Sequence, residues 1–217
     1  NKLVIDFSKI FIAHNDETLS ISSLHNNMVS LESKVPSIIS SKHNIEMDKN
    51  KINVVFITRF NSDEPILEMI NSTKYFGEEF QFYMTGNYNK MFNNSEIIKY
   101  KNIKFTGFVA DQIYNEIIYN CDIHVVLTIR DFTLLYGGRE SISLEKPLVI
   151  SDNKTCKKYF DKGSIFVNNT AKNIAKGIKM AYENKTILKE QMKSLKIEKN
   201  KIWNSKIKDL KLKINLL

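Results

Sequence analysis

The sequence predicts an α/β fold, with a Rossmann-like parallel sheet and helices on both of its faces. Six short apolar, β-branched or aromatic runs alternate along the chain with helical patterns. These runs are almost continuously apolar, as strands buried on both faces are, and the connections between them are too long for hairpins. The composition is that of a folded globular protein, because 42% of the 217 residues are hydrophobic and 26% are charged, with only 7 Gly and 3 Pro.

Each predicted element follows from its local pattern. The predicted strands are Asn53–Thr58, Gln81–Met84, Ile103–Phe105, Ile123–Leu127, Pro147–Ile150 and Ser164–Val167. Helical periodicity indicates helices over Pro65–Thr73, Asp111–Asn120, Gly138–Leu144, Lys154–Phe160 and Asn173–Tyr182. Ahead of the first of these strands, the pattern predicts a strand over Lys9–Ala13, a helix over Asp16–Leu24 and a polar connection over Ser40–Lys51.

We expect three segments along the chain. Residues 1–52 are interpreted as the end of a preceding domain followed by a linker, and residues 53–184 as the domain that holds the parallel sheet. Residues 185–217 are predicted to form a lysine-rich C-terminal helix. Because the chain starts at Asn1 and turns apolar by Leu3, we expect it to be a piece of a larger protein.

Several classes of protein are disfavoured by what the sequence lacks. Two cysteines, Cys121 and Cys156, are too few for a four-cysteine metal site or a disulfide framework, and Cys121 lies in an apolar stretch typical of a buried thiol. His124 lies within an apolar run and is expected to be a core histidine, and the other histidines show no metal-ligand spacing. No apolar run approaches the roughly 20 residues that span a bilayer. We therefore expect a cytoplasmic protein without a metal or cofactor.

The positive charge is concentrated near the C-terminus. From Lys185 to Lys213 there are ten lysines against three acidic residues, so most of the net charge of +8 lies in this stretch. Its apolar residues recur at roughly helical spacing: Ile187, Leu188, Met192, Leu195, Ile202 and Trp203. We expect the part up to Trp203 to pack on the body and the lysines beyond it to be exposed. Two interpretations stay open, an ordinary solvated helix and a cationic surface that holds the protein at an anionic membrane, whereas nucleic acid is not an expected partner.

Polar and small residues follow the predicted strands at the edge where open parallel sheets bind ligands. They are Arg59 after the first strand, Thr85 and Gly86 after the second, Gly107 after the third, and Thr128 to Asp131 after the fourth. The chain has only three arginines among 32 basic residues, and Arg59, Arg130 and Arg139 all fall at this edge or in a glycine turn. A guanidinium group has several N–H donors in one plane, which suit phosphate oxygens, so this placement of the arginines indicates an anionic ligand.

The run Gly137-Gly138-Arg139-Glu140-Ser141 is the strongest local signal. Two glycines that open a helix expose backbone amides suited to a phosphate or a pyrophosphate. Glu140 has two interpretations, a capping carboxylate of that helix or an acceptor of hydrogen bonds from a ribose diol.

The stretches Cys121–Thr128 and Gly137–Asp152 resemble the C-terminal, donor-binding half of family 4 glycosyltransferases, which are retaining enzymes with the GT-B fold. Glu140–Ile150 is similar to the family's Glu-Ala-x-x-x-Gly-Lys-Pro-Val-Ile motif, and Thr106-Gly107-Phe108 to its turn before a helix. Ile165–Ile178 is similar to its closing strand and helix, so the resemblance covers roughly residues 53–203.

The resemblance implies a hexosyltransferase that moves a sugar from a nucleotide-sugar donor to a glycan or lipid-linked acceptor, with retention and without a metal. Residues 1–35 would then be a remnant of the acceptor-side domain, so the chain alone is expected to bind donor and to transfer little sugar. The implied catalytic residues are Asp131 and Glu140, with Glu140 at the ribose and Asp131, together with Thr133, at the donor sugar. The implied donor-binding residues are Arg59, Thr85, Gly86, Gly107, Thr128, Arg130, Thr133, Gly137, Gly138 and Ser141.

The sequence departs from the family pattern at two positions. The family's lysine five residues after Arg59 is Glu64, and its glutamate eight residues before Glu140 is Phe132, with Asp131 one place away. We expect Arg130 to supply the missing positive charge. Because of these departures, a second interpretation stays open, in which the chain is a non-catalytic nucleotide-sugar-binding domain of the same fold. A nucleotide-sugar epimerase is a second alternative, which fits the Glu140–Pro147 spacing and the loop after Leu127 less well.

Overall fold

The computed structural model describes residues 11–13, 28–38 and 47–215. The chain divides into two compact units, residues 36–195 and residues 1–35 together with 196–217. The helix predicted over Asp16–Leu24 and most of the connection predicted over Ser40–Lys51 lie outside the described residues.

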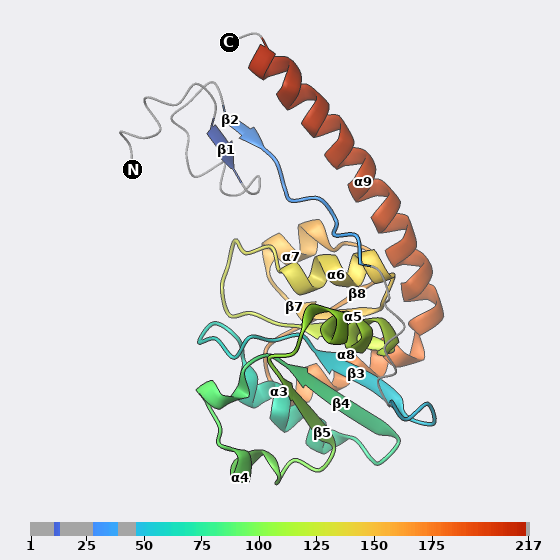
Figure 1. Cartoon of the computed structure of the whole chain (residues 1–217). Coiled ribbons are helices and arrows are strands. Elements are labelled where there is room, and N and C mark those ends of the chain that lie inside the picture. Colours follow the sequence, from blue (N-terminus) through green and yellow to red (C-terminus); the bar gives the residue numbers. More distant parts are fainter. Residues whose placement is uncertain (1–10, 14–27, 39–46, 216–217) are drawn as a thin grey trace. The chain divides into compact units, whose positions relative to one another are not determined.

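A six-stranded parallel sheet forms the centre of the larger unit (Figure 1). Its strands are β3 (Ile52–Phe56), β4 (Phe80–Thr85), β5 (Ile103–Gly107), β6 (Ile123–Val126), β7 (Leu148–Ser151) and β8 (Ser164–Val167). They lie in the order β5-β4-β3-β6-β7-β8 and every neighbouring pair is parallel. All six predicted strands are confirmed, with ends shifted by at most two residues. The order reverses between β3 and β6, so the topological switch point lies between these two strands.

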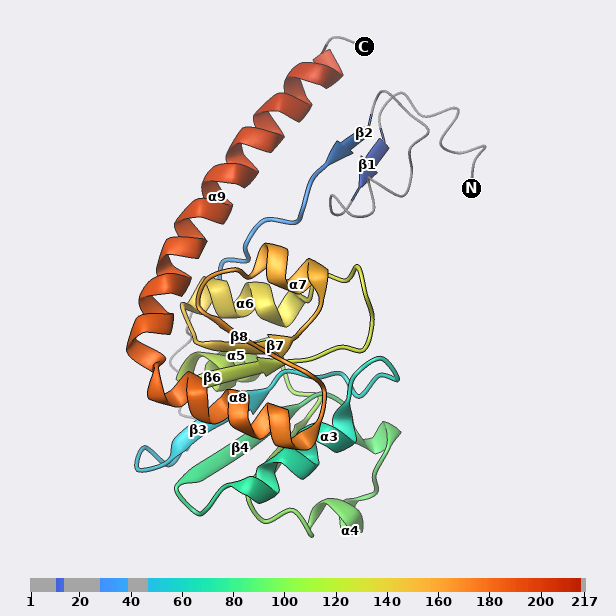
Figure 2. The same cartoon turned by 180° about the vertical axis from the view of Figure 1, so that it is seen from behind.

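Helices cover both faces of the sheet (Figures 1 and 2). They are α3 (Ile66–Ser72), α4 (Asn94–Ile97), α5 (Asp111–Asn120), α6 (Tyr136–Leu144), α7 (Lys154–Tyr159) and α8 (Ala171–Glu183), with short 3₁₀ turns η1 (Thr73–Tyr75) and η2 (Tyr88–Lys90). Successive strand residues point to opposite faces. Val54 and Phe56 therefore pack with α3 and α8, while Val55 packs with α5. The predicted helices of this unit are confirmed to within two residues, whereas α4, η1 and η2 were not predicted.

The buried polar residues of this core are held by hydrogen bonds. His124 is fully buried, with its Nδ1 2.9 Å from the Ser141 hydroxyl oxygen and its Nε2 2.7 Å from the Ile118 carbonyl oxygen. Burial lowers the pKa of His124 to about 3, so the ring is neutral. The prediction of a core histidine is confirmed, and Cys121 is a buried free thiol as expected.

The smaller unit contains a parallel pair of short strands, β1 (Phe11–Ala13) and β2 (Met28–Ser30). β1 falls within the strand predicted over Lys9–Ala13, and β2 was not predicted. In the same unit the Lys34 ammonium lies 5.5 Å from the centre of the Trp203 ring.

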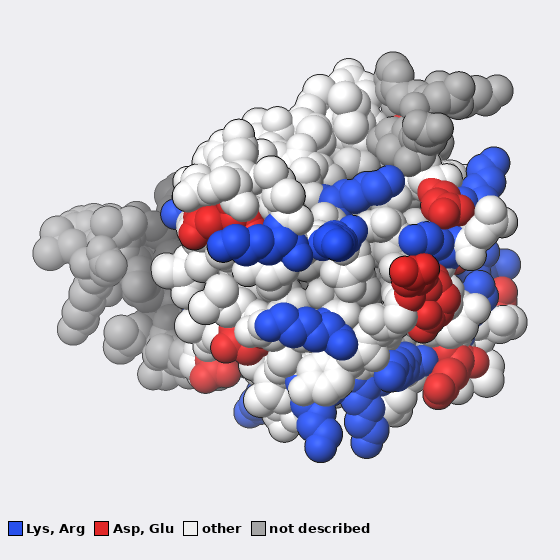
Figure 3. All heavy atoms as spheres, turned by 90° about the horizontal axis from the view of Figure 1, so that it is seen from below, with Lys and Arg blue, Asp and Glu red and all other residues white. Residues whose placement is uncertain are grey.

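The long helix α9 (Lys185–Asn215) begins in the larger unit and ends in the smaller one. Leu188, Met192 and Leu195 are buried, as their spacing predicted, but Ile187 is 61% exposed and does not belong to the packed face. Beyond Trp203, the side chains of Lys208, Lys211 and Lys213 are exposed and that of Lys206 is half-buried. Among the described helices, none is both long and apolar enough to cross a membrane. On the face shown in Figure 3, basic and acidic side chains are intermingled.

Candidate functional site

A large cavity lies at the carboxyl end of the sheet, beside the switch point. Its volume is about 1020 Å³, at the upper end of the range for small-molecule sites. The loops after β3, β4, β5 and β6 and the first turn of α6 line it, and we name it the main pocket. A smaller hollow of about 150 Å³ follows β6, β7 and β8, and Thr128 lines both.

The loops after β3 and β4 are held against one another. Gly86 has a φ of +97°, and a Cβ atom on it would overlap the carbonyl oxygen of Thr58. The Thr58 hydroxyl donates to the Thr85 carbonyl oxygen at 2.6 Å, and the Thr58 amide donates to the Thr85 hydroxyl oxygen at 3.1 Å. Thr85 and Gly86, both predicted site residues, therefore line the main pocket and also fix its geometry.

Glu64 organises the loop that carries Arg59. Both Glu64 carboxylate oxygens accept from the Arg59 amide, at 3.1 and 3.0 Å, and one accepts from the Asn61 amide at 2.9 Å. Burial raises the pKa of the Glu64 carboxyl above its ordinary value. The residue that stands where the family resemblance implies a lysine thus binds backbone amides inside the pocket wall.

Glu140 lines the main pocket from the second turn of α6 and is 5% exposed. The Tyr114 hydroxyl, on α5, donates to its Oε2 atom at 2.6 Å. Burial raises the pKa of Glu140 to about 7, although the Tyr114 hydrogen bond and the charge of Arg59 act in the opposite direction. Burial and the neighbouring Glu140 charge also raise the pKa of Tyr114. Tyr114 was not predicted, because nothing local marks one helical tyrosine as the partner of a glutamate 26 positions away.

The two glycines at the start of α6 have different surroundings. Gly137 lines the main pocket, and a Cβ atom on it would lie 2.8 Å from the Ile57 side chain. Gly138 packs instead against Phe160, the residue after α7, since its Cβ would lie 2.6 Å from that ring. The first amides of a helix have no acceptor within it, so the α6 N-terminus presents donors beside Glu140. Ser141 is buried and donates to the Gly137 carbonyl oxygen at 2.8 Å, so its hydroxyl does not line the pocket.

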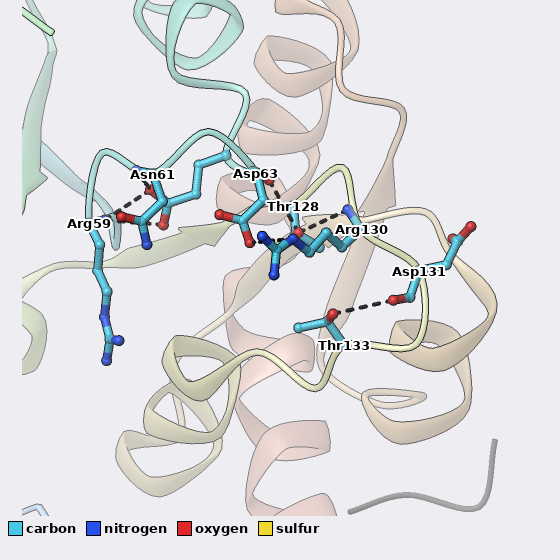
Figure 4. A network of polar contacts seen from close by, with 8 residues as sticks. Arg59, Asn61, Asp63, Thr128, Arg130, Asp131 and Thr133 are labelled. Carbon is cyan, nitrogen blue, oxygen red and sulfur yellow. Dashed lines mark hydrogen bonds and ion pairs between the residues drawn. The ribbon is translucent and has the colours of Figure 1, made fainter. Parts of the chain in front are cut away.

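Arg130 and Asp131 line the smaller hollow, and Arg130 lies beside Asp63 and Thr128, which line the main pocket (Figure 4). The Arg130 Nε atom is 3.3 Å from an Asp63 carboxylate oxygen, and the Arg130 amide donates to the Thr128 hydroxyl oxygen at 3.1 Å. Asp131 is exposed, and its carbonyl oxygen accepts from the Thr133 hydroxyl at 3.3 Å. Arg130 itself lines the smaller hollow, and it pairs with a carboxylate of the main-pocket wall, so its expected contribution of positive charge to the ligand stays a prediction.

The remaining predicted residues divide between pocket and core. Arg59, Gly107, Thr128 and Thr133 line the main pocket, with Gly107 at a φ of +70°. Arg139 is 6% exposed with its guanidinium 5.0 Å from the centre of the Tyr136 ring, and it does not line the pocket.

The structure adds residues that sequence reasoning missed. Lys90, from η2, lines the main pocket, and so do the apolar side chains of Ile38, Phe108 and Val109. Phe108 is 92% exposed. Within the described residues, no group of three or more His, Cys, Asp or Glu side chains is arranged to hold a metal ion. The pocket thus combines a helix N-terminus, two basic side chains, four acidic side chains of which that of Glu140 is buried, and an apolar wall.

No protein-family model and no curated protein sequence matches this chain. Solved structures do match it. A glycosyltransferase from Rickettsia africae is 15% identical with a TM-score of 0.70, over 94% of this chain and 62% of that one. Sucrose-phosphate synthase from Thermosynechococcus elongatus is 12% identical with a TM-score of 0.76, over 99% and 60%. Anabaena HepE, in complex with UDP-glucose, is 12% identical with a TM-score of 0.74, over 97% and 65%.

The chain has the fold of the Rossmann-like half of a GT-B glycosyltransferase. Identities of this size establish the fold alone, so membership of family 4 and retention of configuration stay predictions. The chain spans about 60–65% of the length of these three proteins.

Proposed function

We propose that this chain is the donor-binding half of a retaining, family 4-type glycosyltransferase and that the main pocket binds the nucleotide part of a nucleotide sugar. The observation that carries the proposal is the meeting of Glu140, the α6 N-terminus and Arg59 in one pocket at the switch point. A buried carboxylate that accepts hydrogen bonds from a diol, beside amides and a guanidinium that bind an anion, is complementary to a nucleoside diphosphate.

The chemistry follows from where charge develops. In sugar transfer the bond between the anomeric carbon and the diphosphate oxygen breaks, and that oxygen leaves with the electron pair. The acceptor oxygen forms the new bond and passes its proton to the departing diphosphate oxygen. Helix amides and Arg59 stabilise the departing diphosphate. Glu140 holds the ribose through the carboxylate oxygen that Tyr114 leaves available. Thr133, in the pocket, and Asp131, next to it, remain the predicted contacts of the donor sugar.

The acceptor side is a further part of the proposal. A glycan or lipid-linked acceptor would bind mainly to a domain outside residues 36–195, so this chain alone is expected to bind donor and to transfer little sugar. The exposed lysines Lys208, Lys211 and Lys213 fit a cytoplasmic protein held at an anionic membrane, at about 1 kcal/mol per lysine close to the surface. Co-sedimentation with anionic but not neutral vesicles is expected, and equal or absent binding to both would leave α9 an ordinary solvated helix.

Titration calorimetry with UDP and GDP tests the proposal. Glu140→Ala should weaken binding of whichever nucleotide binds by about 1–3 kcal/mol, the usual loss when a hydrogen bond to a charged group is removed. Glu183→Ala, an exposed residue at the end of α8, is the matched control and should leave binding unchanged. Unaltered affinity in Glu140→Ala would remove Glu140 from the site. A chelator should have no effect.

A non-catalytic nucleotide-sugar-binding domain is the second candidate. It is favoured by Glu64, which puts a carboxylate rather than an ammonium group in the pocket wall, and by Phe132, which stands where the resemblance implies a glutamate. Nucleotide-sugar turnover by a longer protein that includes the acceptor side separates the two candidates. Donor binding without release of nucleotide diphosphate would favour the non-catalytic one.

A further inference from the structure

Lys90 occupies a distinctive place on the rim of the main pocket. It ends η2, the turn that follows β4, and its ammonium group donates to the Arg59 carbonyl oxygen and to the Asn61 side-chain oxygen, each at 2.9 Å. Lys90 and Arg59 therefore lie side by side although they are 31 positions apart in the sequence. The neighbouring loop fixes the ammonium group in the pocket wall.

These two contacts do not neutralise the charge of Lys90. Both acceptors are neutral, and an ammonium group has three N–H donors, so one donor is available to a ligand. Arg130, by contrast, lies 3.3 Å from the Asp63 carboxylate and lines the smaller hollow. Among the described residues that line the main pocket, the basic side chains are Arg59 and Lys90.

The fold places Lys90 there by a close backbone approach. Gly86 brings the loop after β4 against Thr58, just before Arg59 in the loop after β3. Within the β4 loop, the Asn87 side chain accepts from the Asn89 amide at 3.2 Å and caps η2. The Tyr88 ring packs edge-on against Phe105, with centres 5.7 Å apart. The turn that carries Lys90 is thus anchored on both sides.

We propose that Lys90 is the second phosphate-binding cation of the main pocket, and that it binds the diphosphate of the ligand together with Arg59. The inference rests on the proposed function and adds a residue to it. Glu64 holds the loop amides at the position where a basic residue was expected, and Lys90 supplies the positive charge from the adjacent strand end. A site so arranged neutralises the developing charge of a leaving diphosphate with two cations from different loops.

The test uses the full chain and three substitutions. Lys90→Gln removes the charge, Lys90→Arg keeps it, and Lys74→Gln is the matched control, because Lys74 is also exposed and also donates to an asparagine side-chain oxygen, at 2.8 Å, away from the pocket. Affinity is measured for the tighter-binding of UDP and GDP and, by competition, for the matching nucleoside. Circular dichroism and thermal unfolding confirm that each variant is folded.

Lys90→Gln should bind the diphosphate about tenfold more weakly, as expected for loss of one charge-assisted hydrogen bond, and should bind the nucleoside as the unaltered protein does. Lys90→Arg should restore most of the affinity, and Lys74→Gln should change neither. Unchanged diphosphate affinity in Lys90→Gln, while Glu140→Ala still weakens binding, would overturn the role of Lys90 and leave the proposed function standing. An equal loss for diphosphate and nucleoside would also overturn it, because Lys90 would then act only on loop geometry. Absence of binding by either nucleotide to the unaltered protein would overturn both proposals.

Discussion

The part of the main pocket's rim around Gly86 and the Arg130–Asp131 part of the loop after β6 lie at the same edge of the sheet, yet they are built differently. At the rim, Gly86, Thr58 and Thr85 interlock through a close backbone approach and buried hydrogen bonds. In the loop after β6, Arg130 and Asp131 are exposed, and Arg130 pairs with Asp63. A position just after a parallel strand therefore places a side chain at the ligand-binding edge, but the loop's own contacts decide which hollow it lines.

The largest effect is expected where the rim is interlocked. Gly86→Ala should lower the free energy of unfolding by about 3 kcal/mol, because a side chain at this positive φ is strained and its Cβ would overlap the Thr58 carbonyl oxygen. Gly107→Ala is the matched control, with a φ of +70° but its nearest neighbour 3.7 Å away, and should cost about 1 kcal/mol from strain alone. Denaturant unfolding measures both. Equal losses would show that the close approach at Gly86 contributes nothing.

The next effect concerns the charge of Glu140. Burial raises its pKa to about 7, and ribose hydroxyls donate to the ionised carboxylate, so nucleoside affinity should rise as pH increases through 7. With that pKa the ionised fraction falls about tenfold between pH 8 and pH 6, and affinity should fall with it. A nucleoside rather than a nucleotide is titrated, so that phosphate ionisation does not contribute. Glu140→Gln should remove the dependence, and a variant that keeps it would assign the titration to another group.

A smaller effect is expected for Tyr114, which positions Glu140. Tyr114→Phe removes the 2.6 Å hydrogen bond and should weaken nucleotide binding by about 1 kcal/mol. Because this bond lowers the pKa of Glu140, its loss should also move the pH midpoint of binding upward. Tyr119→Phe, on the same helix and 46% exposed, is the control for loss of a hydroxyl. An unchanged midpoint in Tyr114→Phe would mean that the bond does not act on the carboxylate.

The smallest effects are expected in the loop after β6. Arg130→Gln and Asp131→Asn should each change the affinity for UDP or GDP by less than about 0.5 kcal/mol, since an exposed ion pair contributes little and neither residue lines the main pocket. The same variants are titrated with the matching nucleotide sugar. A loss for the sugar nucleotide alone would place Asp131 at the donor sugar, as predicted, whereas a large loss for the bare diphosphate would contradict the division into two hollows.

Much of the fold could be predicted, because its signals are local. Short apolar runs predicted the six strands and period-3.6 patterns predicted the larger helices, with Asp111–Asn120 predicted to the residue. The elements that were missed, β2, α4, η1 and η2, are three or four residues long. Segments of that length carry too few residues to show a period, and tertiary contacts decide their conformation.

The candidate site could be predicted only as a set of strand ends. The sequence by itself determined that Arg59, Gly86, Gly107 and Glu140 would meet at one edge, because parallel strands place their carboxyl ends together. It also determined the start of a helix near Gly137, because glycine and the apolar period that follows are local features.

The tertiary structure alone decided which side chains face one another. It placed Gly137 in the pocket wall and Gly138 against Phe160, and it paired Tyr114 with Glu140. It also paired Arg130 with Asp63 and placed Lys90 beside Arg59. Each of these outcomes depends on strand order and on how closely two loops approach. Spacing along a chain fixes the direction of a side chain within its own element, whereas its neighbours are set by the packing of elements that are tens of residues apart.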